Sequence, residues 1–149
     1  MPSSNLIALP AVQSLRKTIT FTGGAGAGLN ASPIPFFNIT KGVQIVGIWG
    51  LVTTNLTVSN VLATISLGVT GSTALFIPLT VANTLLTSAP VWGSTTATAG
   101  GLLLPSVTQN TAVGANIIGT VGGTGDVTGG VLDIYCTFYA ANGASLVVA

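Results

Sequence analysis

Apolar and polar residues alternate with a period of two along three segments of the chain, the spacing of a β-strand with one face on a core and one in solvent. Residues 16–22 place Ile19 and Phe21 opposite threonines. Residues 61–69 carry an apolar residue at every second position, and so do residues 132–139. On the last segment the expected inward face is Leu132, Ile134, Cys136 and Phe138. We predict a strand at each of the three segments.

Shorter runs of the same character recur along the chain and are separated by glycine, asparagine and proline. These weaker strand candidates are residues 35–40, 74–80, 85–92, 102–108, 115–121 and 145–148. Helical periodicity is nearly absent, because Gly, Pro, Thr and Val interrupt every window that could form a stable helix. Many short strands with turn signals between them predict an all-β fold, a two-sheet antiparallel β-sandwich of jelly-roll or Greek-key type.

Residues 43–52 differ, because both alternating faces of the expected strand are apolar. Such a strand is covered on both sides, so one face belongs to the core and the other needs a second layer from a loop or another subunit. The two faces are Val43, Ile45, Trp49 and Leu51 on one side and Val46, Ile48 and Val52 on the other. We expect a contact surface between subunits that includes Val46, Ile48, Trp49 and Val52.

Residues 1–15 fit no strand pattern, whereas residues 16–149 show no internal repeat or linker and are predicted to form a single β-sandwich domain. A frayed terminus is one interpretation of the first segment. The other is an extended N-terminal arm that docks on a neighbouring subunit, since a disordered tail has little use for so many aliphatic side chains. The side chains that would dock are Leu6, Ile7, Leu9 and Val12.

Charged side chains are scarce: they make up 3% of the 149 residues, where roughly 25% is usual. They are Arg16, Lys17, Lys41, Asp126 and Asp133. Without His or Glu the chain cannot form a metal site built on those ligands, a Ser-His-Asp triad, a Cys-His pair or a two-Glu acid–base pair. We therefore predict a protein that is not an enzyme and that uses no cofactor or metal.

The scarcity of charged side chains also limits the classes of partner that the chain can bind. The chain has 3 Lys and Arg side chains, too few to neutralise the roughly six or more phosphates of a nucleic-acid site. Its most apolar stretch, residues 43–52, is much shorter than the roughly 20 residues of a membrane-spanning helix. A net charge of +1 favours association over colloidal separation. We expect no nucleic acid and no membrane as partners, and we expect other protein subunits.

The two carboxylates are candidates for structural roles. Asp126 lies in a glycine-rich turn, where an aspartate side chain can cap its own turn. Asp133 projects from the polar face of its predicted strand. Its possible partners are Arg16, Lys17 and Lys41.

Few other residues suggest chemistry. The glycine-rich residues 23–28 lack the spacing of a dinucleotide-binding loop and of a P-loop, so a tight connection is expected. Cys136 shares the inward face of its strand with apolar neighbours and is expected to be a small buried hydrophobe. Trp49 and Trp92 are the largest packing groups, and each is either a core residue or an interface anchor.

Short motifs stand at both ends of the chain. They are Lys17-Thr18-Ile19-Thr20-Phe21-Thr22-Gly23 near the start, and Ile118-Gly119-Thr120-Val121, Asp126-Val127-Thr128-Gly129-Gly130-Val131-Leu132, Tyr135-Cys136 and residues 143–149 near the end. Covering roughly a third of the chain, these motifs resemble those of small tailed-bacteriophage virion proteins of the capsid cement or decoration type.

The resemblance implies a β-sandwich clamped on the outside of an icosahedral shell as a dimer or trimer, with the major capsid protein as partner and no catalytic residues. The expected location is the outer capsid surface of the virion, after assembly in the host cytoplasm. We therefore expect a structural virion protein that stabilises the shell through apolar inter-subunit contacts. The alternative is a head fibre, tail or spike component that binds a host surface carbohydrate through the aromatic residues Trp92, Tyr135 and Tyr139.

Overall fold

The computed structural model describes residues 11–39, 43–93, 116–140 and 146–149, and their regular structure is almost entirely β. The strands are β1 (Val12–Thr20), β2 (Pro33–Ile39), β3 (Val43–Val58), β4 (Thr64–Val69), β5 (Ser72–Val81), β6 (Val91–Trp92), β7 (Ile117–Gly122), β8 (Val127–Ala140) and β9 (Leu146–Val148). A short 3-10 turn, η1 (Ala82–Thr84), lies between β5 and β6.

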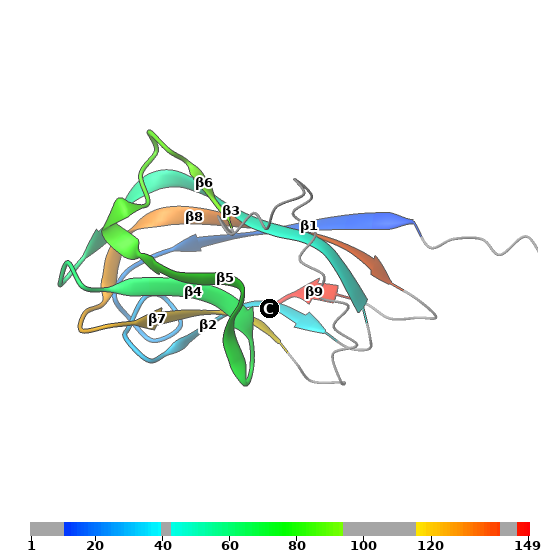
Figure 1. Ribbon diagram of the computed structural model, residues 1–149, viewed down its shortest axis with the longest axis horizontal. Coiled ribbons are helices and arrows are strands. Elements are labelled where there is room, and N and C mark those ends of the chain that lie inside the picture. Colours follow the sequence, from blue (N-terminus) through cyan, green and yellow to red (C-terminus); the bar gives the residue numbers. More distant parts are fainter. Residues whose placement is uncertain (1–10, 40–42, 94–115, 141–145) are drawn as a thin grey trace, which may run out of the picture.

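The strands form two antiparallel sheets that lie face to face (Figure 1). One sheet has the order β1-β8-β3-β6, and the other has the order β5-β4-β7-β2-β9. The pairs β1·β8, β2·β7, β3·β6 and β4·β5 are nested, as in a long antiparallel hairpin that has rolled up into two sheets. This pairing is that of a jelly roll, to which β9 adds a strand beside β2. The predicted all-β sandwich is confirmed, and of the two expected types it is the jelly roll.

The first strand begins earlier than the sequence pattern indicated. β1 is paired with β8 without interruption from Val12 to Thr20, so the sheet starts four residues before the expected domain boundary at Arg16. Val12 therefore belongs to the sandwich and not to an arm that precedes it. The other residues expected to dock on a neighbouring subunit, Leu6, Ile7 and Leu9, lie outside the described residues.

Two other predicted strands are shorter than expected, because turns take up part of their sequence. Ahead of β4, Asn60 holds a turn in which its side-chain oxygen accepts a hydrogen bond from the Leu62 N–H at 2.9 Å. Of the predicted strand at 85–92, only Val91–Trp92 pairs with β3. The Leu85 N–H instead donates to the carbonyl oxygen of Ala82 at 3.1 Å and continues the turn of η1. The predicted strand at 102–108 lies outside the described residues.

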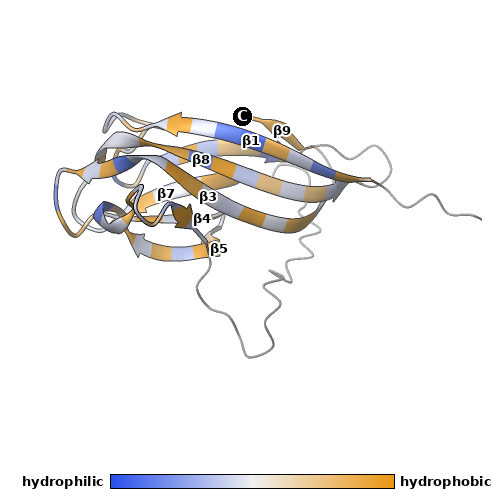
Figure 2. Cartoon of the chain, turned by 90° about the horizontal axis from the view of Figure 1, so that it is seen from above, coloured by the Kyte–Doolittle hydropathy of each residue, from blue (hydrophilic) through white to orange (hydrophobic). Residues whose placement is uncertain are grey.

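The core lies between the two sheets and follows the predicted alternation on β8. The inward side chains of β8 are fully buried, and hydrophobic and polar segments alternate along the strands in Figure 2. These inward residues are Leu132, Ile134, Cys136 and Phe138. The opposite sheet contributes Phe36, Phe37, Ile65 and Leu67. Full burial of one such aliphatic or aromatic side chain contributes roughly 1.5–3 kcal/mol.

A β-bulge at Val46 changes which residues of β3 face the core. Ile45 pairs with Phe138 of β8 and Gly47 pairs with Thr137, so Val46 is an extra residue between them. After the bulge the inward side chains are Ile48 and Val52, which are buried, and Trp49 is exposed. This corrects the expected placement of Ile48 and Val52 on a contact surface, because their side chains fill the core.

Hydrogen bonds join the loops at one end of the sandwich. The Asp126 Oδ1 atom accepts from the backbone N–H of Asn30 at 2.8 Å, and the Asp126 N–H donates to the Ser59 hydroxyl at 2.8 Å. Beside them, the Val127 N–H donates to the carbonyl oxygen of Gly28 at 2.9 Å. Asp126 thus links three separate connections, which corrects the expectation that it caps its own turn.

Candidate functional site

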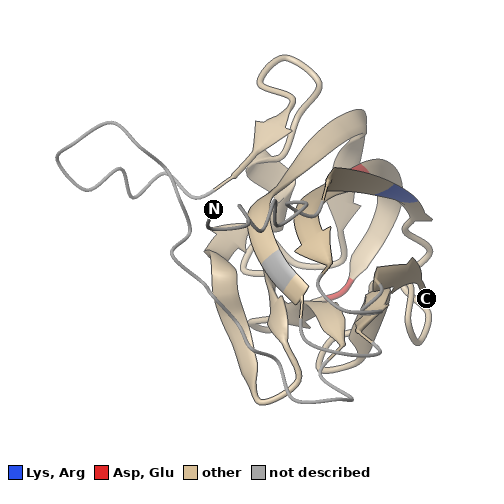
Figure 3. Cartoon of the chain, turned by 90° about the vertical axis from the view of Figure 1, so that its right-hand side faces the viewer, with Lys and Arg blue, Asp and Glu red and all other residues tan. Residues whose placement is uncertain are grey.

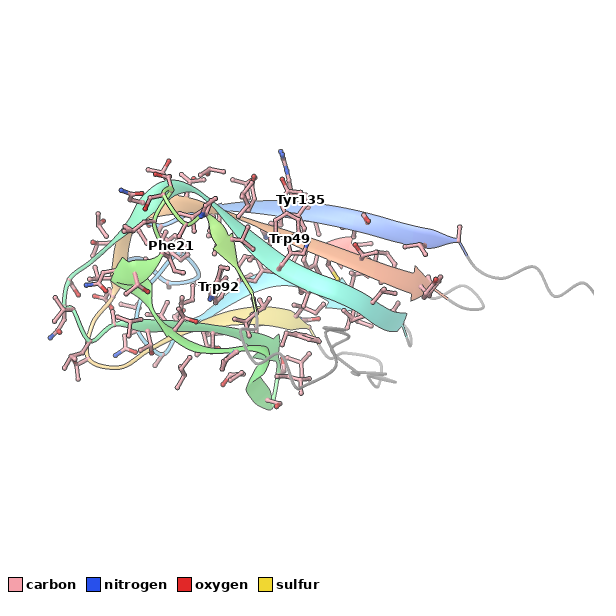
Figure 4. All side chains as sticks on the ribbon, turned by 45° about the horizontal axis from the view of Figure 1, so that its top comes forward. Phe21, Trp49, Trp92 and Tyr135 are labelled. Atoms are coloured by element: carbon pink, nitrogen blue, oxygen red, sulfur yellow. The ribbon has the colours of Figure 1, made fainter. Side chains whose placement is uncertain are left out.

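Three large side chains stand in one row across the outer face of the sheet β1-β8-β3-β6. Arg16 of β1 is paired with Tyr135 of β8, and Tyr135 is paired with Trp49 of β3. The rings of Trp49 and Tyr135 stack with their centroids 4.5 Å apart and an interplanar angle of 13°. Figure 4 shows both rings on the outer side of the sheet and Trp92 between the two sheets. We call Arg16, Tyr135 and Trp49 the aromatic row.

The positive charge of Arg16 in the aromatic row is compensated by the carboxylate of Asp133, which lies beside the row. Asp133 lies two residues before Tyr135 on the same face of β8. Its Oδ2 atom is 3.9 Å from Nη1 of Arg16, and its Oδ1 atom accepts a hydrogen bond from the Thr18 hydroxyl. A side-chain hydrogen bond with Tyr135, and then attraction to Asp133, raise the pKa of Arg16 above its ordinary value. The prediction that Asp133 pairs with a cation is confirmed for Arg16.

Small residues border the row and leave space beside Trp49. Gly47 precedes Trp49 by two residues on the same face of β3, and the β3·β6 register, continued by one pair, places Gly93 opposite Trp49. Among the described residues, a Cβ atom added to either glycine would meet nothing within 4 Å. Next to Gly47, the hydroxyls of Ser14 and Thr137 are 3.2 Å apart. Trp49, which is 38% exposed, therefore stands clear of its neighbours on two sides.

The strands of the other sheet carry no charged side chain of their own, although the Lys17 ammonium group reaches the edge of that sheet at the carbonyl oxygen of Pro35. None of its strands β5, β4, β7, β2 and β9 contains a charged residue, whereas Arg16, Lys17 and Asp133 all belong to β1 and β8. Figure 3 shows the Lys and Arg segment of β1 in blue at one edge of the sandwich, and the red Asp segments lying apart from one another. We call the exposed side chains of the second sheet the uncharged face; they are Pro33, Pro35, Ser72, Thr73, Ala74, Pro78, Leu79, Val81, Val147 and Val148.

The interface residues predicted from the sequence fall in different places. Trp49 and Val12 are exposed on the outer face of the first sheet, and Val46 is half-buried at the bulge. Trp92 is only 2% exposed, and its indole N–H donates to the Thr80 hydroxyl at 3.0 Å, which joins β6 to β5 across the core. This corrects the expectation that Trp92 contributes to a contact surface or to carbohydrate binding.

Sequence reasoning did not bring Arg16, Tyr135 and Trp49 together. The alternation pattern places Tyr135 on the outward face of its strand. For residues 43–52, however, an alternation without a bulge groups Trp49 with Ile45, whose side chain faces the core. A glycine inside a strand marks a bulge or a close approach. Gly47 was the signal in the sequence that could have placed the bulge.

Cys136 has the environment of a structural residue. It is fully buried on the inward face of β8, as predicted. Burial raises the pKa of its thiol to about 12. Since the thiolate is the reactive form of cysteine, the side chain is inert at neutral pH.

Within the described residues, no three His, Cys, Asp or Glu side chains gather where they could hold a metal ion. That part of the chain also has no helix with the length and hydropathy to cross a membrane. No family model, curated protein or solved structure matches the chain. Its two outer faces, one aromatic and polar and the other uncharged, are the features from which a function can be inferred.

Proposed function

We propose that the chain is a structural virion protein of the capsid cement or decoration type, which stabilises a phage icosahedral shell from outside and has the major capsid protein as its partner. The observation that carries this proposal is the uncharged face. Leu79 is 64% exposed there, and Val81 is also exposed. A protein surface that faces only water usually has about 25–35% charged residues. A sheet face without charged residues suits a protein that is in contact with other subunits.

The proposed mechanism is burial of the uncharged face between or upon capsomers. Removal of apolar surface from water contributes roughly 25 cal/mol per Å². Ion pairs would contribute less as salt rises, because the Debye length falls from about 10 Å at 0.1 M to about 3 Å at 1 M. Attachment through this face should therefore persist at high salt.

The fold and the motifs agree with the proposal. Jelly rolls are found in viral capsid and lectin domains, although a fold alone does not define a function. The motifs that resemble those of phage decoration proteins lie along β1, β7, β8 and β9. They include strands of both sheets.

A dimer or trimer is part of the proposal, and the charges of β1 bear on how it would form. β1 lies at the edge of its sheet and carries Arg16 and Lys17. Charged side chains on an edge strand oppose pairing with the edge of another sheet. Lys17 is also engaged within the sandwich, where its Nζ atom donates to the carbonyl oxygen of Pro35 at 2.9 Å. We therefore propose that subunits meet through faces and not through the β1 edge.

A pair of matched variants tests this function. Leu79→Asp places a charge on the uncharged face, and Val91→Asp places one at a residue of the first sheet that is 67% exposed. Co-sedimentation with shells that lack the protein should show loss of binding for Leu79→Asp and retention for Val91→Asp. Wild-type binding should be the same at low salt and at about 1 M salt. Equal binding by both variants, or release by salt alone, would show the proposed attachment to be wrong.

The alternative, a head fibre, tail or spike component, predicts a different copy number. A decoration protein is present in hundreds of copies per particle, whereas a fibre or spike is present in a few to a few dozen. Stoichiometry against the major capsid protein separates the two.

A further inference from the structure

We propose that the aromatic row is a binding site for a neutral saccharide. This inference goes beyond the structural role proposed above and does not rest on it, because the aromatic row and the uncharged face belong to opposite sheets. The chain would bind the saccharide whether or not it is attached to a shell.

The open ring of Trp49 is the first reason for this assignment. Tyr135 covers one face of the indole at a centroid distance of 4.5 Å. The β3·β6 register, continued by one pair, places Gly93 on the side of the other face, and within the described part of the chain a Cβ there would meet nothing within 4 Å. A pyranose ring has an apolar C–H face, and an exposed aromatic ring offers it a flat apolar surface at little entropic cost. The stack thus fits a sugar ring as a third layer above Gly93.

Hydrogen-bonding groups lie on the same sheet face, on the side of the rings that carries β8 and β1. The Arg16 side chain is 59% exposed and has five N–H donors, more than its contacts with Tyr135 and Asp133 use. The hydroxyls of Ser14 and Thr137 lie one row away and can each donate and accept. These groups are on β1 and β8, on the far side of the stacked rings from Gly93, so an oligosaccharide that begins over Gly93 would reach them by crossing the outer edges of Trp49 and Tyr135. Ligand sites generally combine apolar surface with a few placed polar groups in this way.

The electrostatics favour a ligand without charge. The carboxylate of Asp133 lies 3.9 Å from the guanidinium of Arg16, so the positive charge at the site is already compensated. No other charged residue belongs to β1, β3, β6 or β8 apart from Lys17, whose ammonium group is engaged with Pro35 on the other sheet. A neutral saccharide is therefore the complementary class, and an acidic one is not.

A protein partner fits this face less well than it fits the uncharged face. Trp, Tyr and Arg do dominate the binding energy of protein interfaces, but they do so inside a packed rim that excludes water. Around Trp49 the rim is interrupted by Gly47 and Gly93, and it continues into the paired hydroxyls of Ser14 and Thr137. The exposed aliphatic side chains of the second sheet form the more suitable protein contact.

Titration with defined oligosaccharides tests the proposal. The probes are maltoheptaose, cellohexaose and hexa-N-acetylchitohexaose as neutral saccharides and a hexagalacturonate as an acidic one, each up to about 10 mM, followed by calorimetry and by tryptophan fluorescence. At least one neutral probe should bind saturably and change the emission of Trp49. Trp49→Ala should lower its affinity about tenfold or more. The matched control Leu79→Asp, on the opposite sheet, should bind within about twofold of the wild type.

Two glycine variants keep the test valid if Trp49→Ala does not fold. Gly47→Leu and Gly93→Leu fill the open space beside the indole without entering the core, and each should reduce saccharide affinity while leaving the unfolding transition in place. Absence of saturable binding to every neutral probe would overturn the proposal. Binding that survives all three variants, or a preference for the acidic probe, would overturn it as well. Loss of shell binding in Trp49→Ala without any saccharide binding would identify the row as a protein contact instead.

Discussion

Trp49 of β3 and Tyr135 of β8 are direct partners in the strand pairing, and their rings stack outside the sandwich at a centroid distance of 4.5 Å. Trp92, paired with Gly50 next to Trp49, lies inside it. The chain's two tryptophans are therefore separated by the thickness of one sheet. One is available to a ligand, and the other holds the core together.

This difference predicts unequal effects of truncation. Trp92→Ala should lower the free energy of unfolding by about 3–5 kcal/mol, because it leaves a large cavity in the core. Trp49→Ala should lower it by less, about 1–2 kcal/mol, because the half-exposed ring loses its stacking on Tyr135 and only part of a buried surface. Urea unfolding of the two variants measures both values. Equal losses would contradict the placement of the two rings.

Quenching of fluorescence checks the same placement without a stability measurement. Iodide should quench the emission of Trp49 and leave that of Trp92, which is 2% exposed, nearly unchanged. The variant Trp49→Phe should therefore show a blue-shifted emission that iodide does not quench. An accessible tryptophan in that variant would be incompatible with the buried Trp92.

Gly28 should be intolerant of any side chain. Its φ of +117° is in the region that favours glycine, and a Cβ there would overlap the carbonyl oxygen of Val127. Gly28→Ala should lower the free energy of unfolding by about 2–3 kcal/mol. The control Gly47→Ala, where a Cβ meets open space, should change it by about 0.5 kcal/mol or less. Thermal unfolding of both variants under one condition makes the comparison, and similar losses would refute it.

The burial of the Cys136 thiol predicts that the folded state loses stability at alkaline pH. Burial raises the pKa of its thiol from 9.0 to about 12, so the folded state holds its proton over a range in which the unfolded state releases it. The contribution is complete below the unfolded pKa and is lost as pH rises from 9.0 to about 12. Within this range the free energy of unfolding should fall by about 1.4 kcal/mol per pH unit.

The variant Cys136→Ala is the control for that slope. It should lack this part of the pH dependence. Its deficit in unfolding free energy relative to the wild type should therefore shrink as pH rises above 9.0. A deficit that stays constant to about pH 11 would show that the thiol does not titrate as its burial requires.

The uncharged face predicts self-association of the isolated chain. At a net charge of +1 there is little repulsion between copies, and the exposed Leu79 and Val81 can be buried between them. The sedimentation coefficient should rise with protein concentration and should not fall at high salt. Leu79→Asp should shift the distribution toward the monomer. A wild-type chain that stays monomeric at high concentration would count against the proposed contact surface.

Much of the fold could be predicted from the sequence, because alternation reports directly which side of a strand is buried. The inward residues Leu132, Ile134, Cys136 and Phe138 of β8 were predicted correctly, although the strand begins earlier, at Val127. Alternation fails where the period breaks. The bulge at Val46 shifts the pattern by one residue, so Ile48 and Val52 are core residues although they were expected on a contact surface.

The candidate site was harder to predict than the fold, since it depends on pairing between distant strands. Arg16, Tyr135 and Trp49 come from three strands, and only the register brings them into one row. Asp126 shows the same limit: its turn was recognised, but its partner Asn30 is remote in sequence. Local patterns contain no information on such long-range partners.

The most direct test of the proposed structural role is the amount of this chain in purified particles. Particles washed at about 1 M salt should be separated by gel electrophoresis and the band intensity compared with that of the major capsid protein. A decoration protein bound through an uncharged face predicts hundreds of copies per particle, unchanged by the wash. A few copies per particle, or a band that the salt wash removes, would contradict the account.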